Sequence, residues 1–458
     1  MAELVALAAA AVTSVWISRV MGAEFLGFFA VAATVLAFAQ AFTDAGLPSL
    51  GAQLIANEPA SQRAVWRHVT GMRSAAALLG AILGGIAVTA LDATSPLRLL
   101  LVGSVVALAV SPINGMFVLV AVGAIRSVAL IRACGSLVST LIAVMFIRSN
   151  ADTVALAVLL LVPGIVNGVS STALILRHES SRRPFKVVSS MPRTLTAWYR
   201  RAFDYAKADI SILIYMSIDR LLLFATAGAL VVGLYEAAFR LIQPFYALST
   251  VVRESMFLEL ARAVRGDHLA PTLKRWARLM FVATIPLGPF LSLHGAWVIA
   301  LVYGPTFAEA ALPLAILGWA ITIGFVSGAV VLPFLSWNLG REYGNAVLAG
   351  NVTNVAGNLA LTPALGATGA ALATVAAKIA VTVVGLGPFR ATSTFPIIRW
   401  SIRYFTASVL AAIASVATWA VSDHEPISIL TYGLAYAAFV GLIEWSEAGL
   451  PRILRSNP

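Results

Sequence analysis

Long apolar runs separated by short polar connections cover most of the chain. Fourteen of these runs are about 17 to 25 residues long, the length that a helix needs to cross the hydrocarbon core of a bilayer. In lipid the backbone must satisfy its own polar groups, and a helix does so within one segment. The pattern therefore predicts fourteen transmembrane helices, at about residues 4–20, 25–47, 74–91, 99–120, 127–147, 154–176, 204–226, 230–252, 279–302, 311–337, 346–364, 369–387, 404–421 and 427–443.

One phrase of small and apolar residues occurs twice, 206 residues apart, at 22–32 and 228–238. Each copy reads Gly-Ala, three residues, Gly, an apolar residue, an aromatic residue, two residues and Ala. Six predicted helices separate the copies, and because six is even, both copies face the same side of the membrane. The chain is therefore predicted to be a parallel repeat of two six-helix lobes, an organisation typical of transporters.

Composition indicates an integral membrane protein. Apolar residues make up 60% of the chain and charged residues 11%, and the mean hydropathy is +0.91. A soluble domain of this size would expose more charge and less apolar surface. The single cysteine, Cys134, excludes an intrachain disulfide, a zinc cluster and a thiol redox pair.

Basic residues lie mostly on one side of the predicted helices. Of the 31 lysines and arginines, 24 fall in the connections after even-numbered helices or in the C-terminal tail, whereas Arg19, Arg98 and Arg148 fall on the other side. The positive-inside rule places the 24 residues, and both termini, in the cytoplasm. The net charge of +11 is then a topology signal that also meets anionic membrane lipids, and no nucleic-acid partner is predicted.

The connections do not suit an enzyme. Every predicted outer connection is short, and the two long ones, 177–201 and 253–278, are basic, cytoplasmic and without a catalytic constellation. A membrane polymerase or ligase of glycans would need a sizeable outer loop for its substrate. The chain is therefore predicted not to be an enzyme, with no catalytic residue and no metal site.

Charged residues inside the apolar runs indicate function, because each costs about 2.5–3.5 kcal/mol at the centre of a lipid-facing helix. Lys378 lies near the middle of its run, too deep to reach the interface, and is predicted to line a polar pathway. Arg240 either lines that pathway or pairs with Glu236 one turn before it. Asp219 and Arg220 are adjacent, about 100° apart on a helix, so at least one of them is predicted to face an interior cavity.

Other charges have two interpretations. Asp209 is the deepest charge at the cytoplasmic end of the seventh run, and with Asp219 and Glu236 it is a candidate ion-coupling carboxylate. Arg132 either turns inward or extends to the interface, and the second is favoured.

Three asparagines, Asn351, Asn354 and Asn358, share one face of the eleventh predicted helix. They either line the passage or hydrogen-bond neighbouring helices, and the structural role is favoured because polar side chains commonly join transmembrane helices.

Several motifs resemble one protein family. They are ISRVMGAEFLGFF (17–29) with DAGL (44–47), SIDR (217–220) with GLY (233–235) and Ala238, YGPTFAEA (303–310) and LGATGAALAT (365–374). In this order they resemble the polysaccharide biosynthesis and export proteins, the O-antigen and exopolysaccharide flippases, which belong to the multidrug, oligosaccharidyl-lipid and polysaccharide exporter superfamily.

The resemblance implies an all-α membrane protein in which two six-helix lobes enclose a V-shaped central cavity and two further helices follow. On this chain the N-terminal lobe is expected at 1–176, a basic cytoplasmic linker at 177–203 and the C-terminal lobe at 204–387. The two extra helices and a cytoplasmic tail are expected at 388–458.

The resemblance also implies a flippase of the bacterial inner membrane. Such a protein moves a polyprenyl-diphosphate-linked oligosaccharide from the cytoplasmic to the periplasmic leaflet by alternating access, without a cofactor, coupled to H⁺, Na⁺ or the membrane potential, and beside other membrane proteins of polysaccharide assembly. A hydrated diphosphate needs fixed cations in a wet cleft. Lys378, Arg240 and Arg220 are the candidates, and Arg132 is a further one.

Two related functions stay open. A multidrug antiporter of the same superfamily shares the two lobes, but it usually stops at twelve helices and uses acidic sites for cationic cargo. A lipid II flippase shares the fold, but basic residues within the first two helices, prominent in some of those proteins, are limited here to Arg19. The last two helices and the interior cations favour the lipid-linked oligosaccharide.

Overall fold

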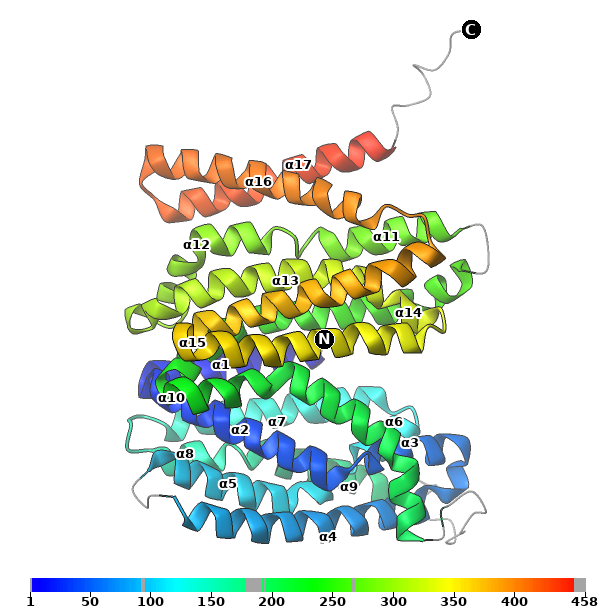
Figure 1. Cartoon of the computed structure of the whole chain (residues 1–458). Coiled ribbons are helices and arrows are strands. Elements are labelled where there is room, and N and C mark those ends of the chain that lie inside the picture. The colour runs from blue at the N-terminus through cyan, green and yellow to red at the C-terminus, as the bar shows by residue number, and fades with distance from the viewer. Residues whose placement is uncertain (1, 92–94, 178–191, 193, 265–267, 449–458) are drawn as a thin grey trace. The chain divides into compact units, whose positions relative to one another are not determined.

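The computed structural model describes residues 2–91, 95–177, 192, 194–264 and 268–448, and every regular element in these ranges is helical (Figure 1). The chain divides into two compact units, Met1–Glu236 and Ala237–Pro458. Most of the predicted linker at 177–203, and the tail from residue 449, lie outside the described residues. The lobe boundaries expected from the sequence stay a prediction.

The N-terminal unit consists of α-helices joined by short turns. Its described elements are α1 (Ala2–Met21), α2 (Ala23–Asp44), α3 (Leu47–Asn57), η1 (Pro59–Ser61), α4 (Gln62–Thr89), α5 (Pro96–Val110), η2 (Ser111–Ile113), α6 (Met116–Ala121), α7 (Ile125–Phe146), α8 (Thr153–Val158), α9 (Val162–Arg177) and the first part of α10 (Leu195–Ala263).

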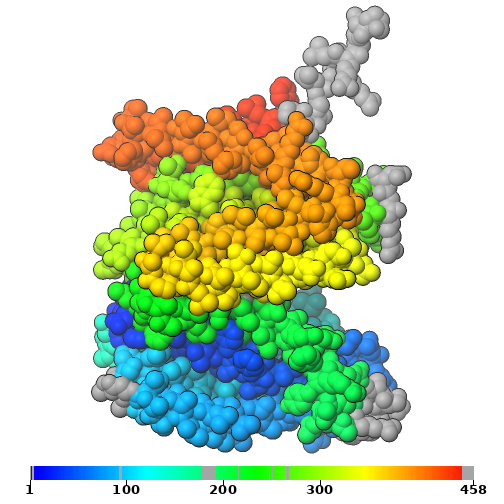
Figure 2. Space-filling view, in the orientation of Figure 1, coloured from blue at the N-terminus to red at the C-terminus, as the bar shows by residue number. Residues whose placement is uncertain are grey.

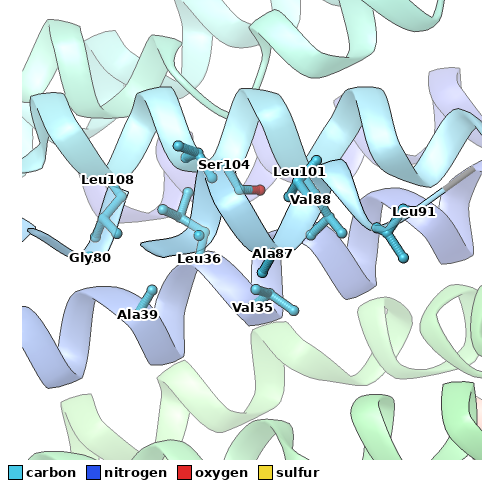
Figure 3. Close-up of a pocket in the computed structure, with 12 residues that line it drawn as sticks. Val35, Leu36, Ala39, Gly80, Ala87, Val88, Leu91, Leu101, Ser104 and Leu108 are labelled. Atoms are coloured by element: carbon cyan, nitrogen blue, oxygen red, sulfur yellow. The ribbon is translucent and has the colours of Figure 1, made fainter. Parts of the chain in front are cut away.

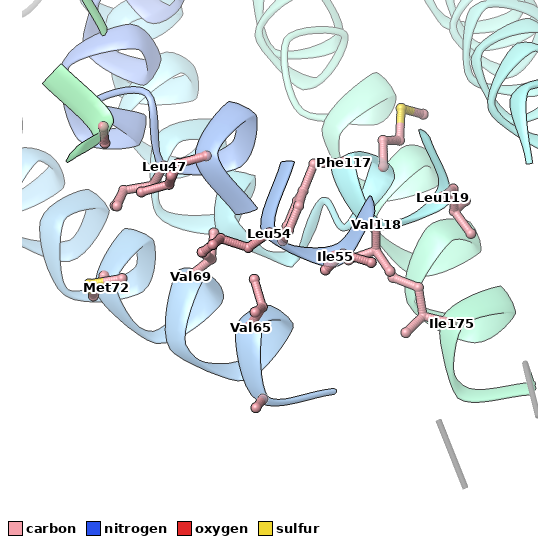
Figure 4. Packing of buried hydrophobic residues seen from close by; sticks show 14 of the residues in the cluster. Leu47, Leu54, Ile55, Val65, Val69, Met72, Phe117, Val118, Leu119 and Ile175 are labelled. Atoms are coloured by element: carbon pink, nitrogen blue, oxygen red, sulfur yellow. The ribbon is translucent and has the colours of Figure 1, made fainter. Parts of the chain in front are cut away.

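One apolar core in this unit joins six helices, namely α3, α4, α6, α7, α9 and the start of α10 (Figure 4). Ile55 of α3, Val65 of α4 and Val118 of α6 are fully enclosed there, and Ile175 of α9 closes it. The sequence analysis predicted no helix over 47–57, because a run of 11 residues is too short to cross a bilayer. It is instead an amphipathic helix whose apolar side covers this core.

The C-terminal unit likewise consists of helices joined by short connections in the part of the chain that the structure describes. Its described elements are the rest of α10, α11 (Leu269–Phe281), α12 (Leu287–Val302), η4 (Pro305–Ala310), α13 (Ala311–Val331), α14 (Pro333–Ser336), α15 (Gly340–Thr392), α16 (Ile397–Ser422) and α17 (Glu425–Ala448).

Two of the longest helices reverse direction at a glycine. α10 contains Gly228 with φ +80°, and α15 contains Gly366 with φ +53°. Residues 16 apart in a straight helix are separated by about 24 Å, yet Arg220 and Glu236 form an ion pair in the N-terminal unit. α10 is therefore two antiparallel helices joined at Gly228. Gly357 and Ala373 of α15 are also in contact, so α15 reverses in the same way.

The fold class predicted from the sequence is confirmed. Ten helical stretches of the described chain are long and apolar enough to cross a membrane, and two apolar helices, Val5–Met21 and Leu287–Val302, are shorter. The stretches that contain Gly228 and Gly366 each count once among the ten, although the chain reverses within them. The predicted count of fourteen transmembrane helices stays a prediction.

The outward faces of the helices are suited to lipid. Figure 2 shows one face of the molecule, on which α4 and α16 reach the surface. Leu79, Leu83 and Ile86 of α4 and Ile413 of α16 each expose more than half of their surface. Apolar side chains in such rows are expected on a membrane protein, because lipid tails are as apolar as they are.

A short turn joins the end of α7 to the start of α8. The carboxylate of Asp152 accepts hydrogen bonds from the backbone N–H groups of Arg148 and Ser149, both at 2.8 Å. These two bonds, with that of Arg148 the larger, hold the pKa of Asp152 below its usual value. The predicted outer connection at 148–153 is thus a compact turn.

The two copies of the repeated phrase pack against each other. Gly22 and Gly228 have nearly the same backbone angles, φ +88° with ψ 179° and φ +80° with ψ 178°, a conformation that favours glycine. A Cβ on Gly27 would overlap the carbonyl oxygen of Ala229, and a Cβ on Gly233 would overlap that of Ala23. The contact is reciprocal and brings two backbones together through small residues, as in other membrane helix pairs.

We expect Gly233→Ala to lower the free energy of unfolding by about 1–3 kcal/mol, because the added methyl group forces the two backbones apart. Thermal or denaturant unfolding of the purified protein measures this change. Gly85→Ala is the matched control, since a Cβ there meets no atom within 4 Å and alanine favours the helix. Equal effects of the two substitutions would contradict the close crossing.

Candidate functional site

Four buried polar residues meet where the two halves of α10 face each other. The Nε of Arg220 donates to the Oε2 of Glu236 at 2.7 Å, and its Nη1 donates to the carbonyl oxygen of Met216 at 2.9 Å. The hydroxyl of Tyr235 donates to the Oδ2 of Asp219. Asp219, Arg220 and Glu236 are each less than one-tenth exposed, and the prediction that one of them faces an interior cavity stays a prediction. We call the four residues 219, 220, 235 and 236 the α10 cluster.

The charge of the α10 cluster decides what it can hold. Within these four residues, two carboxylates lie beside one guanidinium. Arg220 is committed to Glu236, and removing a charge from a buried pair leaves the partner uncompensated. The arrangement therefore suits a cation or a structural connection between the two halves of α10 better than it suits a phosphate.

Lys378 occupies a different environment in the C-terminal unit. It is 7% exposed and lies in the second half of α15. Its Cδ and Cε lie along Gly324 of α13, 3.5 Å from where a Cβ of that glycine would be, and its Nζ lies 5.2 Å from the centre of the Tyr246 ring. A cation over an aromatic face is stabilised by the ring quadrupole, and Tyr246 in turn stacks on Phe239 at 6.2 Å.

The asparagine row lies on the first half of α15. Asn351, Asn354 and Asn358 are all buried. The Nδ2 of Asn358 donates to the backbone oxygen of Asn354 at 2.9 Å and approaches its Oδ1 at 3.3 Å, and Thr362 donates to the oxygen of Asn358 at 2.6 Å. These bonds lie within one helix, so the predicted choice between helix joining and passage lining stays a prediction.

The remaining predicted residues are more accessible. Arg240 is half-buried in the second half of α10, and Arg132 on α7 and Asp209 on α10 are exposed.

A further buried charge was missed by the sequence analysis, which assigned Arg73 to a cytoplasmic connection. Arg73 lies on α4 and is 5% exposed. Its Nε donates to Asp44 at 2.6 Å, and its Nη1 donates to the carbonyl oxygen of Asn114 at 2.9 Å. The helix between α5 and α6 is broken at Pro112, so Arg73 satisfies a carbonyl group that the break leaves without a helical partner. Arg73 and its partner Asp44 are 29 residues apart in the sequence. This separation matches no helical repeat, so the sequence pattern did not reveal the pair.

An apolar cavity of about 330 Å³ lies between α2, α4 and α5 (Figure 3). Gly80, Gly84 and Ala87 of α4 face Leu36 and Leu108 across it. Its one polar side chain, Ser104, already donates to backbone carbonyl oxygens of Ala32 and Leu100. The cavity thus offers no group that could hold a phosphate or a sugar. Among the residues that the structure describes, no three His, Cys, Asp or Glu side chains gather where they could hold a metal ion.

Comparison with known proteins adds a family and a fold. A family model described as polysaccharide biosynthesis protein matches residues 1–251. No curated protein sequence matches the chain.

Three solved structures are similar to this one. The lipid II flippase MurJ in an inward closed conformation has 14% identity and a TM-score of 0.66 over 98% of each chain. An inward-facing multidrug resistance MATE transporter of the MOP superfamily has 16% identity and a TM-score of 0.58 over 85% of this chain and 98% of its own. The MATE multidrug transporter DinF-BH has 14% identity and a TM-score of 0.55 over 85% of this chain and 93% of its own. At these identities the likeness shows the fold alone.

We expect Arg220→Met to lower the free energy of unfolding by about 3–5 kcal/mol, because it leaves buried carboxylates without their cation. Adding Glu236→Met should recover part of this loss, since the uncompensated charge is then removed. Lys207→Met is the control: its ion pair with Asp204 is exposed, and such pairs are worth about 0–1 kcal/mol. Denaturant unfolding of these three variants and of Glu236→Met alone measures these differences, and additive losses in the double variant would contradict a buried pair.

Proposed function

We propose, from the premise that this chain belongs to the polysaccharide biosynthesis protein family, that it is a flippase for a polyprenyl-diphosphate-linked oligosaccharide. It moves this substrate from the cytoplasmic to the periplasmic leaflet of the bacterial inner membrane, and it is a transporter and not an enzyme. The family match and the MurJ-like fold support a flippase. The substrate is our inference from the charges in the membrane.

The observation that carries the proposal is the environment of Lys378. A diphosphate keeps its charge and its hydration when it crosses a membrane, so the protein must offer a cation at membrane depth. Lys378 provides one: its stem is packed against Gly324 and its ammonium group lies over an aromatic ring. The ring stabilises the charged form of the side chain, which is the form that attracts a phosphate.

The α10 cluster receives a different role in this proposal. Because Arg220 is compensated by Glu236, we assign diphosphate binding to Lys378, with Arg240 as a second cation. Asp219 and Glu236 remain the candidate carboxylates for ion coupling. They lie on either side of the reversal at Gly228, so a change in their charge acts on the angle between the two halves of α10.

We assign the crossing of the two repeated phrases to the closed outer end of the transport passage. On the orientation that the positive-inside rule predicts, Gly22 and Gly228 lie on the outer side, next to the close backbone contacts of Gly27 and Gly233. Alternating access requires this contact to separate when the substrate leaves toward the periplasm.

We expect Lys378→Met to lower the rate of glycan export about tenfold or more while the protein stays folded, because the variant keeps the length of the side chain and removes the charge. The measurement is complementation of a strain lacking the gene, read as the amount of lipid-linked glycan that accumulates on the cytoplasmic side. Lys207→Met is the control, since that lysine is exposed and paired with Asp204.

The same strains separate the alternatives. A multidrug antiporter would change drug sensitivity without accumulation of lipid-linked glycan, and a lipid II flippase would cause a peptidoglycan defect. Either result, or normal export by Lys378→Met, contradicts the proposal.

A further inference from the structure

A buried histidine joins three helices of the C-terminal unit. His294 of α12 is 3% exposed, its Nδ1 lies 2.5 Å from the Oε1 of Glu425 on α17, and its Nε2 lies 3.0 Å from the Oγ of Ser415 on α16. Ser415 and Ser428 hydrogen-bond each other through side chains and backbone at 2.8 Å. The ring also contacts the aromatic rings of Phe290 and Tyr432.

The order serine, histidine and carboxylate is that of a hydrolase triad, but this site cannot work as one. Ser415 has no exposed surface and Ser428 has 1%, so no substrate reaches the hydroxyl group. A nucleophile must be accessible to its substrate. The chemistry left to the site is the exchange of a proton.

The hydrogen bonds satisfy His294 in both of its protonation states. When the ring is neutral, Nδ1–H donates to Glu425 and Nε2 accepts from the hydroxyl of Ser415. When the ring is protonated, Nε2–H donates to Ser415, and the hydroxyl hydrogen turns to the carbonyl oxygen of Ser428, which lies 2.8 Å away. Neither state leaves a buried donor or acceptor unsatisfied, which would otherwise oppose the change.

We propose that His294, Glu425 and Ser415 form a proton-binding site that fastens α16 and α17 to α12 more tightly when the proton is bound. The bound proton gives the ring a full positive charge opposite the Glu425 carboxylate, and this ion pair is stronger than the hydrogen bond that the neutral ring donates to the same carboxylate. Histidine is the residue that most often changes charge near neutral pH. The side chain of Glu425 is one-quarter exposed, so it connects the buried ring to the solution.

The surroundings contain few competing charges. α13, which packs along α12, has no titratable residue, and on α17 the phenol of Tyr432 is the titratable neighbour besides Glu425. Asp423 and His424 in the turn between α16 and α17 are exposed, as is Glu309 of η4. Glu425 is therefore the charged group that contacts the ring.

The charged residues of α16 lie far from the ring along that helix. Arg399, Arg403 and the phenol of Tyr404 are at its start, and Tyr404 comes 11 residues before Ser415. Eleven residues of helix separate two side chains by about 16 Å, so these groups do not compete with Glu425 for the proton of His294.

The first test measures the protonation of His294 directly in the full-length protein in detergent, labelled with ¹³C and ¹⁵N at histidine. The chain has five histidines, and the His294 signal is the one missing from His294→Gln. If that variant does not fold, replacing the other four assigns the signal by elimination. We expect both the charged and the neutral form to be observed across the pH range in which the protein stays folded. In Glu425→Gln the charged form should be less populated at the same pH, because the opposite charge is removed. A signal that stays in one form throughout, or one that Glu425→Gln does not move, overturns the proposal.

The second test measures the fastening of the helices. His294→Gln should lower the unfolding temperature by roughly 4 °C at pH 5.5 and by less at pH 8, because the ion pair is lost as the proton leaves. His424→Gln is the matched control, one residue before Glu425 and exposed, and it should change neither value. A loss that is the same at both pH values would show a structural hydrogen bond without proton exchange and would overturn the proposal.

Discussion

The chain must compensate inside itself each charge that it buries in the membrane, and this requirement accounts for the buried ion pairs described above. Arg73 covers a broken helix and pairs with Asp44, Arg220 pairs with Glu236, and Lys378 lies over the ring of Tyr246. In the water-free interior, a cation that lacked such a contact would have to lose its proton or leave the membrane.

Features that depend on residues recurring along the chain were predictable from the sequence. The apolar runs predicted a helical membrane protein. The repeated phrase predicted two equivalent lobes, which stays a prediction, and its two glycines Gly22 and Gly228 have matching backbone angles. α3 was missed because it is too short to span. The partner of Arg220 was missed because the contact with Glu236 exists only after the chain reverses at Gly228, so neither an i,i+3 nor an i,i+4 rule finds it.

His294 shows the limit of sequence reasoning most clearly. It stands alone among apolar residues, and its partners lie 121 and 131 residues later. A hydropathy pattern places the three helices in the membrane, but it contains no information on which faces meet. The asparagine row is the opposite case, because its spacing alone placed the three side chains on one face, where the structure buries them. Residue spacing predicted which side chains share a face of one helix, whereas contacts between different helices could be identified only in the structure.

The crossing of the two phrases has a consequence for how such a sequence can change over time. Gly27 packs against the backbone of Ala229, and Gly233 packs against the backbone of Ala23. Each copy of the phrase therefore limits the size of the side chains in the other copy. A larger side chain in one copy could persist only with compensation in its twin. Substitutions in the two segments are therefore expected to occur together.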